Sequence, residues 1–204
     1  MSKNTKQKPV VEDKDLPPDK RRDYQLLRRF AAGDEKAFLE IYDAYSKKLL
    51  QYTYRCMGDW QEAEDIVQEV FVQVMKDAAT FEPRASLSTW IYRIATFMCL
   101  KRHRDKGIRR RIIDREAAAG TFEKPVADDD GRRSAEIAEQ VAAVKKTVET
   151  LPGDQKTAFV LREYDGKSYE EIAQITDSEI GTVKSRIFRA RQAIREEMTR
   201  KGLL

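Results

Sequence analysis

The chain of 204 residues contains a single histidine, His103, and this scarcity excludes several classes of metalloprotein. Zinc proteases with an HExxH helix and zinc fingers of the two-histidine type both need more. The two cysteines, Cys56 and Cys99, are too few for a disulfide framework and fit a reducing compartment. Cys99 and His103 stand four positions apart, but two ligands do not hold structural zinc. We therefore expect no metal and no cofactor, with Cys99 in the core and His103 facing solvent or phosphate.

Glycine is also scarce, and its nine residues are spread along the chain rather than gathered in a loop. Nothing matches the glycine-rich loops that cradle phosphates in nucleotide-binding enzymes. No apolar run approaches the ~18 residues of a membrane span, and no basic-then-apolar signal opens the chain. We expect a soluble, cytoplasmic protein that does not insert into membranes and is not an enzyme.

Charged residues are plentiful, and the two signs are unevenly distributed along the chain. Residues 59–69 hold five acidic side chains and no basic one. Residues 101–111 hold seven basic side chains against one acidic, and residues 181–195 hold five basic and no acidic ones. One acidic and two basic surfaces indicate separate partners, a basic protein and a polyanion.

Apolar residues recur with helical spacing over most of the chain, and no segment shows the sustained alternation of a strand. Residues 1–22 are polar, aperiodic and interrupted by prolines, and are predicted to be a disordered tail. Residues 113–138 combine Pro125, two glycines and a run of three aspartates, and are predicted to be a flexible acidic linker. The fold class is therefore all-α, with two small helical domains over residues 23–112 and 139–204.

The most regular helical segment of the first domain begins after Asp59, which can cap a helix, with Glu62 placed to complete a capping box. Its apolar residues form one stripe that we expect to be buried, namely Ala63, Ile66, Val67, Val70, Phe71, Val74, Met75 and Ala78. The opposite face includes Asp65, Gln68, Glu69 and Val72. A solvated polar face is the ordinary interpretation. This face, however, has acidic residues with no basic neighbours and the apolar Val72 among them. That combination favours a docking face for a basic helix.

A second helix is predicted from Ser88 or Thr89, and one of its faces combines aromatic and basic side chains. That face carries Trp90, Arg93, Phe97, Lys101 and Arg104. Bases of single-stranded nucleic acid stack on aromatic rings while Lys and Arg neutralise the phosphates. The alternative is that Trp90 and Phe97 pack against a neighbouring helix. The seven bases of residues 101–111 favour contact with a nucleic-acid backbone.

The second domain contains the pattern of a helix-turn-helix. Ser168 and Glu171 can form a capping box for a short helix, a turn follows at residues 176–178, and a second helix is predicted from about Ile180. Candidate groove-contacting residues of the second helix are Thr182, Lys184, Ser185, Arg186, Phe188 and Arg189. Arg can read guanine edges and Phe can contact a thymine methyl group in the major groove. A generic amphipathic helix pair is the alternative.

These segments together resemble the sigma-70 family of transcription initiation factors. Region 2 of that family resembles residues 58–71, GDWQEAEDIVQEVF, and residues 88–95, STWIYRIA. Region 4 resembles LP at 151–152, SYEEIA at 168–173 and GTVKSRIFRAR at 181–191. Because the chain has no room for further domains, it looks like an extracytoplasmic-function (ECF) sigma factor.

The resemblance implies a role for each surface. Asp65, Gln68, Glu69 and Val72 would dock on the β′ clamp helices of RNA polymerase core, and the core's β flap is a further implied contact. A second set would recognise and melt the −10 element of the promoter: Arg84, Ser86, Leu87, Ser88, Trp90, Arg93, Phe97, Lys101 and Arg104. The loop over residues 84–88 would receive a flipped base, with Leu87 where the family often has an aromatic residue.

The second helix of the C-terminal domain would read the −35 element in duplex DNA, through Thr182, Lys184, Ser185, Arg186, Phe188 and Arg189. Family members usually carry Asn where this chain has Phe97 and often Asp where it has Lys101, so the resemblance implies the activity but does not carry the family's −10 specificity over to this chain. Glu179 replaces a frequent proline and also suits a turn. ECF resemblance further implies a stress or envelope signal, an anti-sigma factor as partner, and a monomer when free.

A stand-alone helix-turn-helix regulator remains the alternative function. It explains the C-terminal half, and it predicts a dimer on a palindromic site. It leaves the acidic face and the aromatic-basic face of the first domain without a purpose. A metal or redox enzyme is a more distant alternative, resting only on Cys99 and His103.

Overall fold

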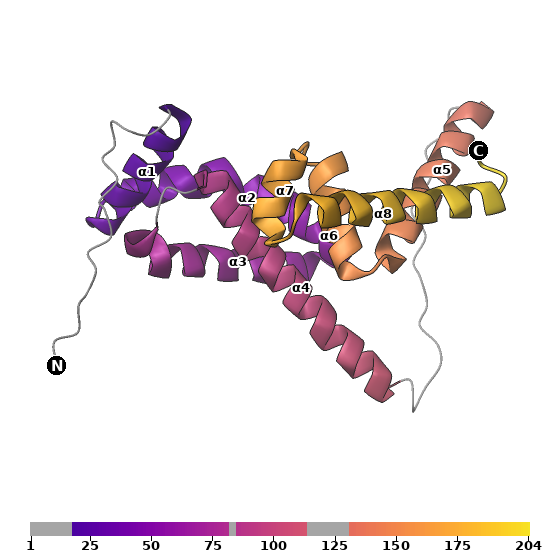
Figure 1. The fold of residues 1–204 in the computed structure, drawn as a ribbon, viewed down its shortest axis with the longest axis horizontal. Coiled ribbons are helices and arrows are strands. Elements are labelled where there is room, and N and C mark those ends of the chain that lie inside the picture. The colour runs from indigo at the N-terminus through magenta and orange to yellow at the C-terminus, as the bar shows by residue number, and fades with distance from the viewer. Residues whose placement is uncertain (1–17, 82–84, 114–130) are drawn as a thin grey trace.

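The computed structural model describes residues 18–81, 85–113 and 131–204, and every regular element within these ranges is helical (Figure 1). In chain order the elements are α1 (Pro18–Ala31), α2 (Glu35–Met57), α3 (Trp60–Asp77), the short 3-10 helix η2 (Ala78–Thr80), α4 (Leu87–Ile113), α5 (Gly131–Thr150), α6 (Gly153–Glu163), α7 (Tyr169–Thr176) and α8 (Ile180–Arg200). The predicted all-α class is confirmed.

Two helices begin inside segments that the sequence assigns to the tail and the linker. Helix α1 begins at Pro18, within the predicted tail. Proline suits a first helical position, because its fixed φ is helical and its missing N–H needs no partner there. Helix α5 begins at Gly131, within the predicted linker. The remainder of both predictions concerns residues 1–17 and 114–130, which lie outside the described residues.

The predicted helix starts are largely confirmed by their caps. Asp59 accepts a 2.8 Å hydrogen bond from the amide of Glu62 and so caps α3. The carboxylate of Glu62 meets Lys106 of α4 instead of completing a capping box. The box at α7 is complete, since Ser168 Oγ accepts from the Glu171 amide at 3.0 Å and Glu171 accepts from the Ser168 amide at 2.8 Å.

The N-terminal unit packs α2, α3 and α4 together, with α1 against α2. Seven of the eight stripe residues predicted on α3 are buried. Met75 is 45% exposed, so its predicted burial is wrong; it lies near the end of α3, three residues after Val72, which is also exposed. A buried hydrogen bond of 2.7 Å joins Tyr52 of α2 to Thr96 of α4 and satisfies both hydroxyls inside the core.

The C-terminal unit builds its core from α6, α7 and α8. Ile172 and Ile175 of α7 are buried with Val183 and Ile187 of α8 and form the inner face of the helix-turn-helix. The turn between them places Asp177 at φ 51°, a left-handed conformation that aspartate tolerates better than most residues. Helix α5 covers the far part of α8 and shares a second apolar cluster with it.

The two units are docked against each other and share one continuous apolar core. Helix α7 packs along α4, and α6 packs on both α2 and α4 (Figure 1). The sequence predicts two tethered domains, and its local patterns do not show this contact between them. Its consequence is that α4 is sandwiched between the helices of its own unit and those of the C-terminal unit.

Removing the cap of α7 tests the local account of the helix-turn-helix. Ser168→Ala deletes the acceptor for the Glu171 amide and is expected to lower the free energy of unfolding by about 1 kcal/mol. Urea denaturation followed by circular dichroism measures it. Ser168→Thr is the matched control, since it keeps the oxygen and should cost less. Equal stability of the Ala variant and the unsubstituted chain would contradict the assignment of the cap.

Candidate polymerase and nucleic-acid interfaces

The acidic face of α3 lines a groove against α4. The groove has a volume of about 400 Å³, and its walls contain Asp65, Gln68, Glu69 and Val72 together with Gln73, Lys76 and Met98. Val72 is 42% exposed, so an apolar side chain does stand open among the polar ones. The four residues that the resemblance assigns to polymerase core therefore share one accessible surface.

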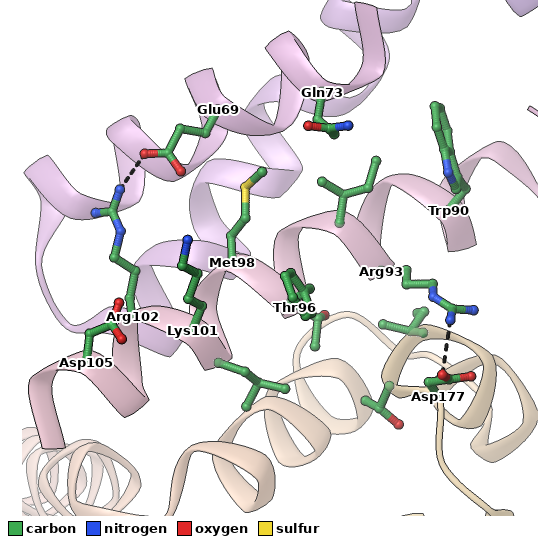
Figure 2. A pocket seen from close by; sticks show the side chains of 15 residues that line it. Glu69, Gln73, Trp90, Arg93, Thr96, Met98, Lys101, Arg102, Asp105 and Asp177 are labelled. Atoms are coloured by element: carbon green, nitrogen blue, oxygen red, sulfur yellow. Dashed lines mark hydrogen bonds and ion pairs between the residues drawn. The ribbon is translucent and has the colours of Figure 1, made fainter. Parts of the chain in front are cut away.

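Two acids of α3 are paired within the chain itself. Glu69 binds Arg102 of α4 (Figure 2), and Glu62 binds Lys106 with 2.6 Å between Oε2 and Nζ. Asp65 makes no ion pair within the described ranges. Part of the basic segment 101–111 thus holds α4 on α3, which corrects the interpretation of wholly separate acidic and basic surfaces.

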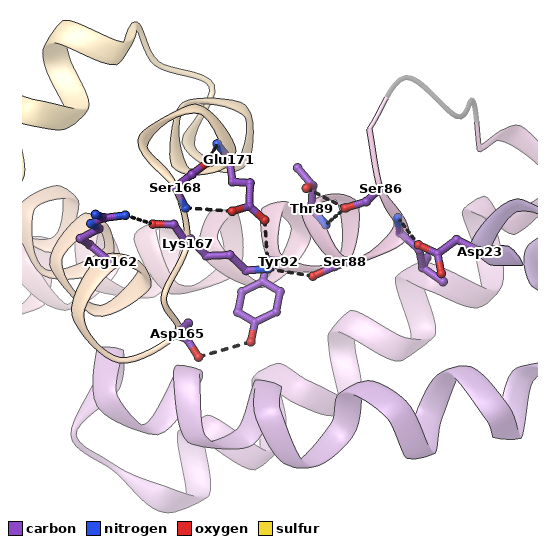
Figure 3. Close-up of polar contacts among 11 residues, drawn as sticks. Asp23, Ser86, Ser88, Thr89, Tyr92, Arg162, Asp165, Lys167, Ser168 and Glu171 are labelled. Carbon is purple, nitrogen blue, oxygen red and sulfur yellow. Dashed lines mark hydrogen bonds and ion pairs between the residues drawn. The ribbon is translucent and has the colours of Figure 1, made fainter. Parts of the chain in front are cut away.

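The start of α4 is fixed by two side-chain caps. The Leu87 amide donates to Oδ2 of Asp23 in α1 at 3.1 Å, and the Thr89 amide donates to Ser86 Oγ at 3.1 Å (Figure 3). Both bonds satisfy amides that a helix start leaves without partners. Leu87, a member of the predicted −10 set, is fully buried in this structure. Arg84, also in that set, lies outside the described residues.

The aromatic-basic face of α4 is present, but its two aromatic residues differ in environment. Phe97 is 62% exposed, as expected for a ring that is free to stack. Trp90 is half-buried, with its ring centroid 5.0 Å from that of Phe81, so it follows the alternative of packing against its own domain. The side chains of Arg93, Lys101 and Arg104 are exposed.

Helix α7 closes one side of this face. A cavity of about 960 Å³ is lined by Trp90, Arg93 and Phe97 of α4 and by Ile175 and Asp177 at the end of α7 (Figure 2). The guanidinium of Arg93 lies 3.2 Å from a carboxylate oxygen of Asp177. The C-terminal unit therefore covers part of the face that the resemblance assigns to −10 DNA.

A second polar contact joins the units near the start of α4. The ammonium of Lys167 donates to Ser88 Oγ at 3.0 Å and lies 5.0 Å from the centroid of the Tyr92 ring (Figure 3). The Tyr92 hydroxyl donates to Oδ1 of Asp165 at 3.4 Å. The other oxygen of Asp165 is buried without a hydrogen-bond partner among the described residues, and burial raises the pKa of this carboxyl.

The outer face of α8 is open. Phe188 is 62% exposed, and the side chains of Thr182, Lys184, Ser185 and Arg189 are exposed beside it. An apolar ring surrounded by donors suits a DNA groove. Arg186 differs, because its guanidinium is held by Asp154 at 3.0 Å and by Ser178 Oγ at 2.8 Å. Arg186 therefore links α8 to Asp154 of α6 and to Ser178 in the turn between α7 and α8.

Sequence reasoning missed a buried polar cluster between the units. Lys156 of α6 is only 2% exposed, and His103 of α4 is half-buried with Nε2 3.0 Å from the Cys56 carbonyl oxygen. The expectation that His103 faces solvent or phosphate is therefore wrong. The available signal in the sequence was the position of Lys156 two residues before the apolar run 158–161. Burial lowers the pKa of both cationic groups.

Cys99 is fully buried, as predicted, and a side-chain hydrogen bond with Cys56 together with burial raises the pKa of its thiol. Over the described ranges, no three His, Cys, Asp or Glu side chains gather as metal ligands would. None of the described helices is both long and apolar enough to cross a membrane.

Comparison with known proteins matches both halves of the chain. The family model for Sigma-70 region 2 matches residues 41–115, and the model for Sigma-70, region 4 matches residues 141–194. The chain is 36% identical over 176 residues to the RNA polymerase sigma-H factor of Pseudomonas aeruginosa, covering 84% of this chain and 91% of that one. It is 34% identical over 178 residues to the ECF RNA polymerase sigma factor SigW of Bacillus subtilis, covering 84% and 94%. The chain belongs to the sigma-70 family and is an ECF sigma factor.

The solved structures agree with this assignment at the level of the fold. CnrH in complex with the cytosolic domain of CnrY matches the ECF sigma factor with a TM-score of 0.61 and 22% identity, over 87% of this chain and 97% of that one. RpoE of Bartonella quintana in complex with the anti-sigma factor NepR gives a TM-score of 0.61 and 24% identity, over 80% and 98%. The N-terminal unit is thus sigma region 2 and the C-terminal unit is sigma region 4, and the protein is a transcription initiation factor.

The different environments of the two aromatic residues predict different costs of truncation. Phe97→Ala should change the free energy of unfolding by less than ~0.5 kcal/mol, since the ring is exposed. Trp90→Ala should cost about 2 kcal/mol, below the ~3–5 kcal/mol of a fully buried aromatic residue. Thermal or urea unfolding of both variants measures this. Equal costs would contradict the placement of the two rings.

Proposed function

We propose that this sigma factor binds RNA polymerase core through the α3 groove and directs it to promoters that contain −35 and −10 elements. Region 4 binds the −35 duplex, and region 2 binds and helps to melt the −10 element. The protein has no catalytic role of its own and acts in the cytoplasm, where the polymerase works. The observation that carries the proposal is the exposed face of α8, where Phe188 stands among Lys184, Ser185 and Arg189 in a sigma-70 framework.

In region 2 we assign −10 contact to the side chains that α4 and the preceding loop leave accessible at least in part: Ser86, Ser88, Trp90, Arg93, Phe97, Lys101 and Arg104. Phe97 is the candidate for stacking on an unpaired base, because an exposed ring has a free face and base stacking is worth ~1–3 kcal/mol. Arg93, Lys101 and Arg104 are candidates for phosphate contacts.

In region 4 we assign −35 contact to Thr182, Lys184, Ser185, Phe188 and Arg189. Arg186 serves these residues indirectly, because its bonds to Asp154 and Ser178 hold the start of α8 in place. We also propose that this sigma factor contacts the β flap of RNA polymerase core. These assignments are consistent with a recognition helix whose outer residues enter the major groove.

An anti-sigma factor is a proposed partner. Two solved structures of similar fold are complexes, of CnrH with CnrY and of RpoE with the anti-sigma factor NepR. We further propose that an envelope or stress signal releases this sigma factor from such a partner, and that the free chain is monomeric.

Transcription from a library of random upstream sequences tests the proposed function. Core RNA polymerase together with this chain is expected to yield transcripts whose templates share two elements near −35 and −10, and core alone is not. DNA binding by the chain without core, with a palindromic consensus and a dimer, would support the alternative of a stand-alone helix-turn-helix regulator and contradict the proposal.

Charge reversal in the groove tests the docking of polymerase core. Asp65 has no ion pair in the described structure to offset its charge, so Asp65→Lys should weaken binding to core by about 2 kcal/mol, roughly 30-fold. Asp43→Lys is the matched control, because Asp43 is an exposed acid of α2 outside the groove. Fluorescence anisotropy against core polymerase measures both. Equal losses for the two variants would contradict the assignment of the groove.

Truncation on α8 tests the reading of the −35 element. Arg189→Ala should cost about 1–3 kcal/mol of promoter affinity in the holoenzyme and relax base preference at one −35 position. Arg195→Ala, an exposed arginine nearer the end of the same helix, should leave base preference unchanged. A uniform loss over all sequences for Arg189→Ala would make this residue a phosphate contact only.

A further inference from the structure

A pocket that the proposed function does not use lies where the turn between α2 and α3 meets α5 and the end of α6. Its volume is about 370 Å³, within the ~300–1,000 Å³ range of small-molecule sites. Its lining includes Tyr54, Arg55, Trp60, Lys145, Glu149 and Tyr164. None of these residues is among those that we assign to polymerase core or to promoter DNA, so an inference about the pocket goes beyond the proposed function and does not depend on it.

Three aromatic side chains of the pocket are open to solvent. The exposed fractions are 42% for Tyr54, 51% for Trp60 and 46% for Tyr164. Tryptophan is highly buried on average, so a half-exposed indole in the wall of a pocket is unusual for a side chain that serves only packing. Exposed rings of this kind offer faces on which a planar ligand can stack.

The same rings are held in position by contacts within the chain. The indole Nε1 of Trp60 donates to Oε1 of Glu64 at 2.9 Å, and the Trp60 ring lies 5.3 Å from that of Tyr54, measured between centroids. The guanidinium carbon of Arg55 lies 4.7 Å from the centroid of the Tyr164 ring. A site whose side chains are already ordered loses less conformational entropy when a ligand binds. The aromatic wall is therefore preorganised.

The charged groups of the pocket favour an anionic ligand. Lys145 is exposed and forms no ion pair within the described ranges. Arg55 is a second cation of the lining, and the nearby carboxylate of Asp165 partly offsets its charge. Glu149 is the acid of the lining, and its carboxylate lies near the buried ammonium of Lys156. Lys145 therefore remains as the cation that is available to an anion such as phosphate.

A nucleotide combines the groups that this lining can bind. Its base can stack on the exposed rings, and stacking of this kind tolerates any base. Its phosphate can accept charge-assisted hydrogen bonds from Lys145. The carboxylate of Glu149 can only accept hydrogen bonds, so it suits the N–H donors on the edge of a base. Lys145 and Glu149 stand four positions apart on α5, with about 5–6 Å between Cβ atoms, so one ligand can reach both.

We propose that this pocket binds a free mononucleotide, with its base stacked against Tyr54 and Trp60 and its phosphate at Lys145. The volume lies at the lower end of the range for small-molecule sites and suits a ligand of about this size. The lining comes from α2 and α3 of region 2 and from α5 and α6 of region 4. The bound nucleotide contacts both regions, so it stabilises their docked arrangement by mass action.

Isothermal titration calorimetry of the full chain with guanosine 5′-monophosphate tests the proposal. This nucleotide should bind more tightly than guanosine, which lacks the phosphate, and more tightly than ribose 5-phosphate, which lacks the base. At saturation it should also raise the midpoint of thermal unfolding, because it binds the folded chain. Absence of binding at millimolar concentrations, or equal affinities for guanosine and its monophosphate, would overturn the proposal.

Two variants locate the binding. Tyr54→Leu removes a stacking face and should weaken binding at least about fivefold. Tyr42→Leu is its matched control, because Tyr42 is a tyrosine of the same helix that is 43% exposed and lies outside the pocket. Lys145→Gln removes the cation for the phosphate and should weaken binding about tenfold. Lys36→Gln, at an exposed lysine near the start of α2, should not weaken it. Circular dichroism checks that all four variants are folded.

The outcomes separate the pocket from other sites and from the proposed function. Unchanged nucleotide affinity in either Tyr54→Leu or Lys145→Gln would place the ligand elsewhere and overturn the proposal. A short single-stranded oligonucleotide that binds more tightly than the mononucleotide, and that loses affinity in the same two variants, would assign the pocket to a nucleic-acid strand and also overturn it. Transcription from the promoter library uses none of these residues, so it tests the proposed function independently.

Discussion

Helix α4 is packed on two sides, and the rest of the structure depends on this constraint. One side contacts α2 and α3 of region 2, through the buried Tyr52–Thr96 hydrogen bond and the ion pairs of Arg102 and Lys106. Another contacts α6 and α7 of region 4. The helix that carries the proposed −10 contacts is therefore the same helix that holds the two regions together, and region 4 covers part of the proposed −10 face in this arrangement.

Much of the local structure could be predicted because its causes are local. The cap at Asp59, the capping box at Ser168 and the start of α8 at Ile180 all follow from short spacings of polar and apolar residues. The exposure of Val72, Phe97 and Phe188 could be predicted in the same way, since each lies opposite the apolar stripe of its helix. The motifs that resemble region 2 and region 4, found in this order along the chain, were sufficient to indicate the sigma-70 family.

The features that were missed arise from contacts between residues far apart in the chain. Glu62 fits a capping box by spacing, but the ammonium of Lys106 from another helix competes for its carboxylate. Leu87 fits a loop by position, yet Asp23 caps its amide and its side chain is buried in the core. His103 lies in a basic segment that predicts solvent exposure, but it packs between the Cys56 carbonyl of α2 and Gly153 of α6. The spacing of apolar and polar residues within one helix does not show which residues of other helices it contacts.

The central claim is that regions 2 and 4 are docked in this structure, whereas the proposed function needs them apart on a promoter with −35 and −10 elements. Energy transfer between dyes on Gln192→Cys in α8 and Lys48→Cys in α2 measures it directly, because both positions are exposed and the native cysteines are buried. The account predicts efficient transfer in the free chain and its loss on assembly with RNA polymerase core and promoter DNA. Transfer that persists unchanged in a transcribing complex would contradict it.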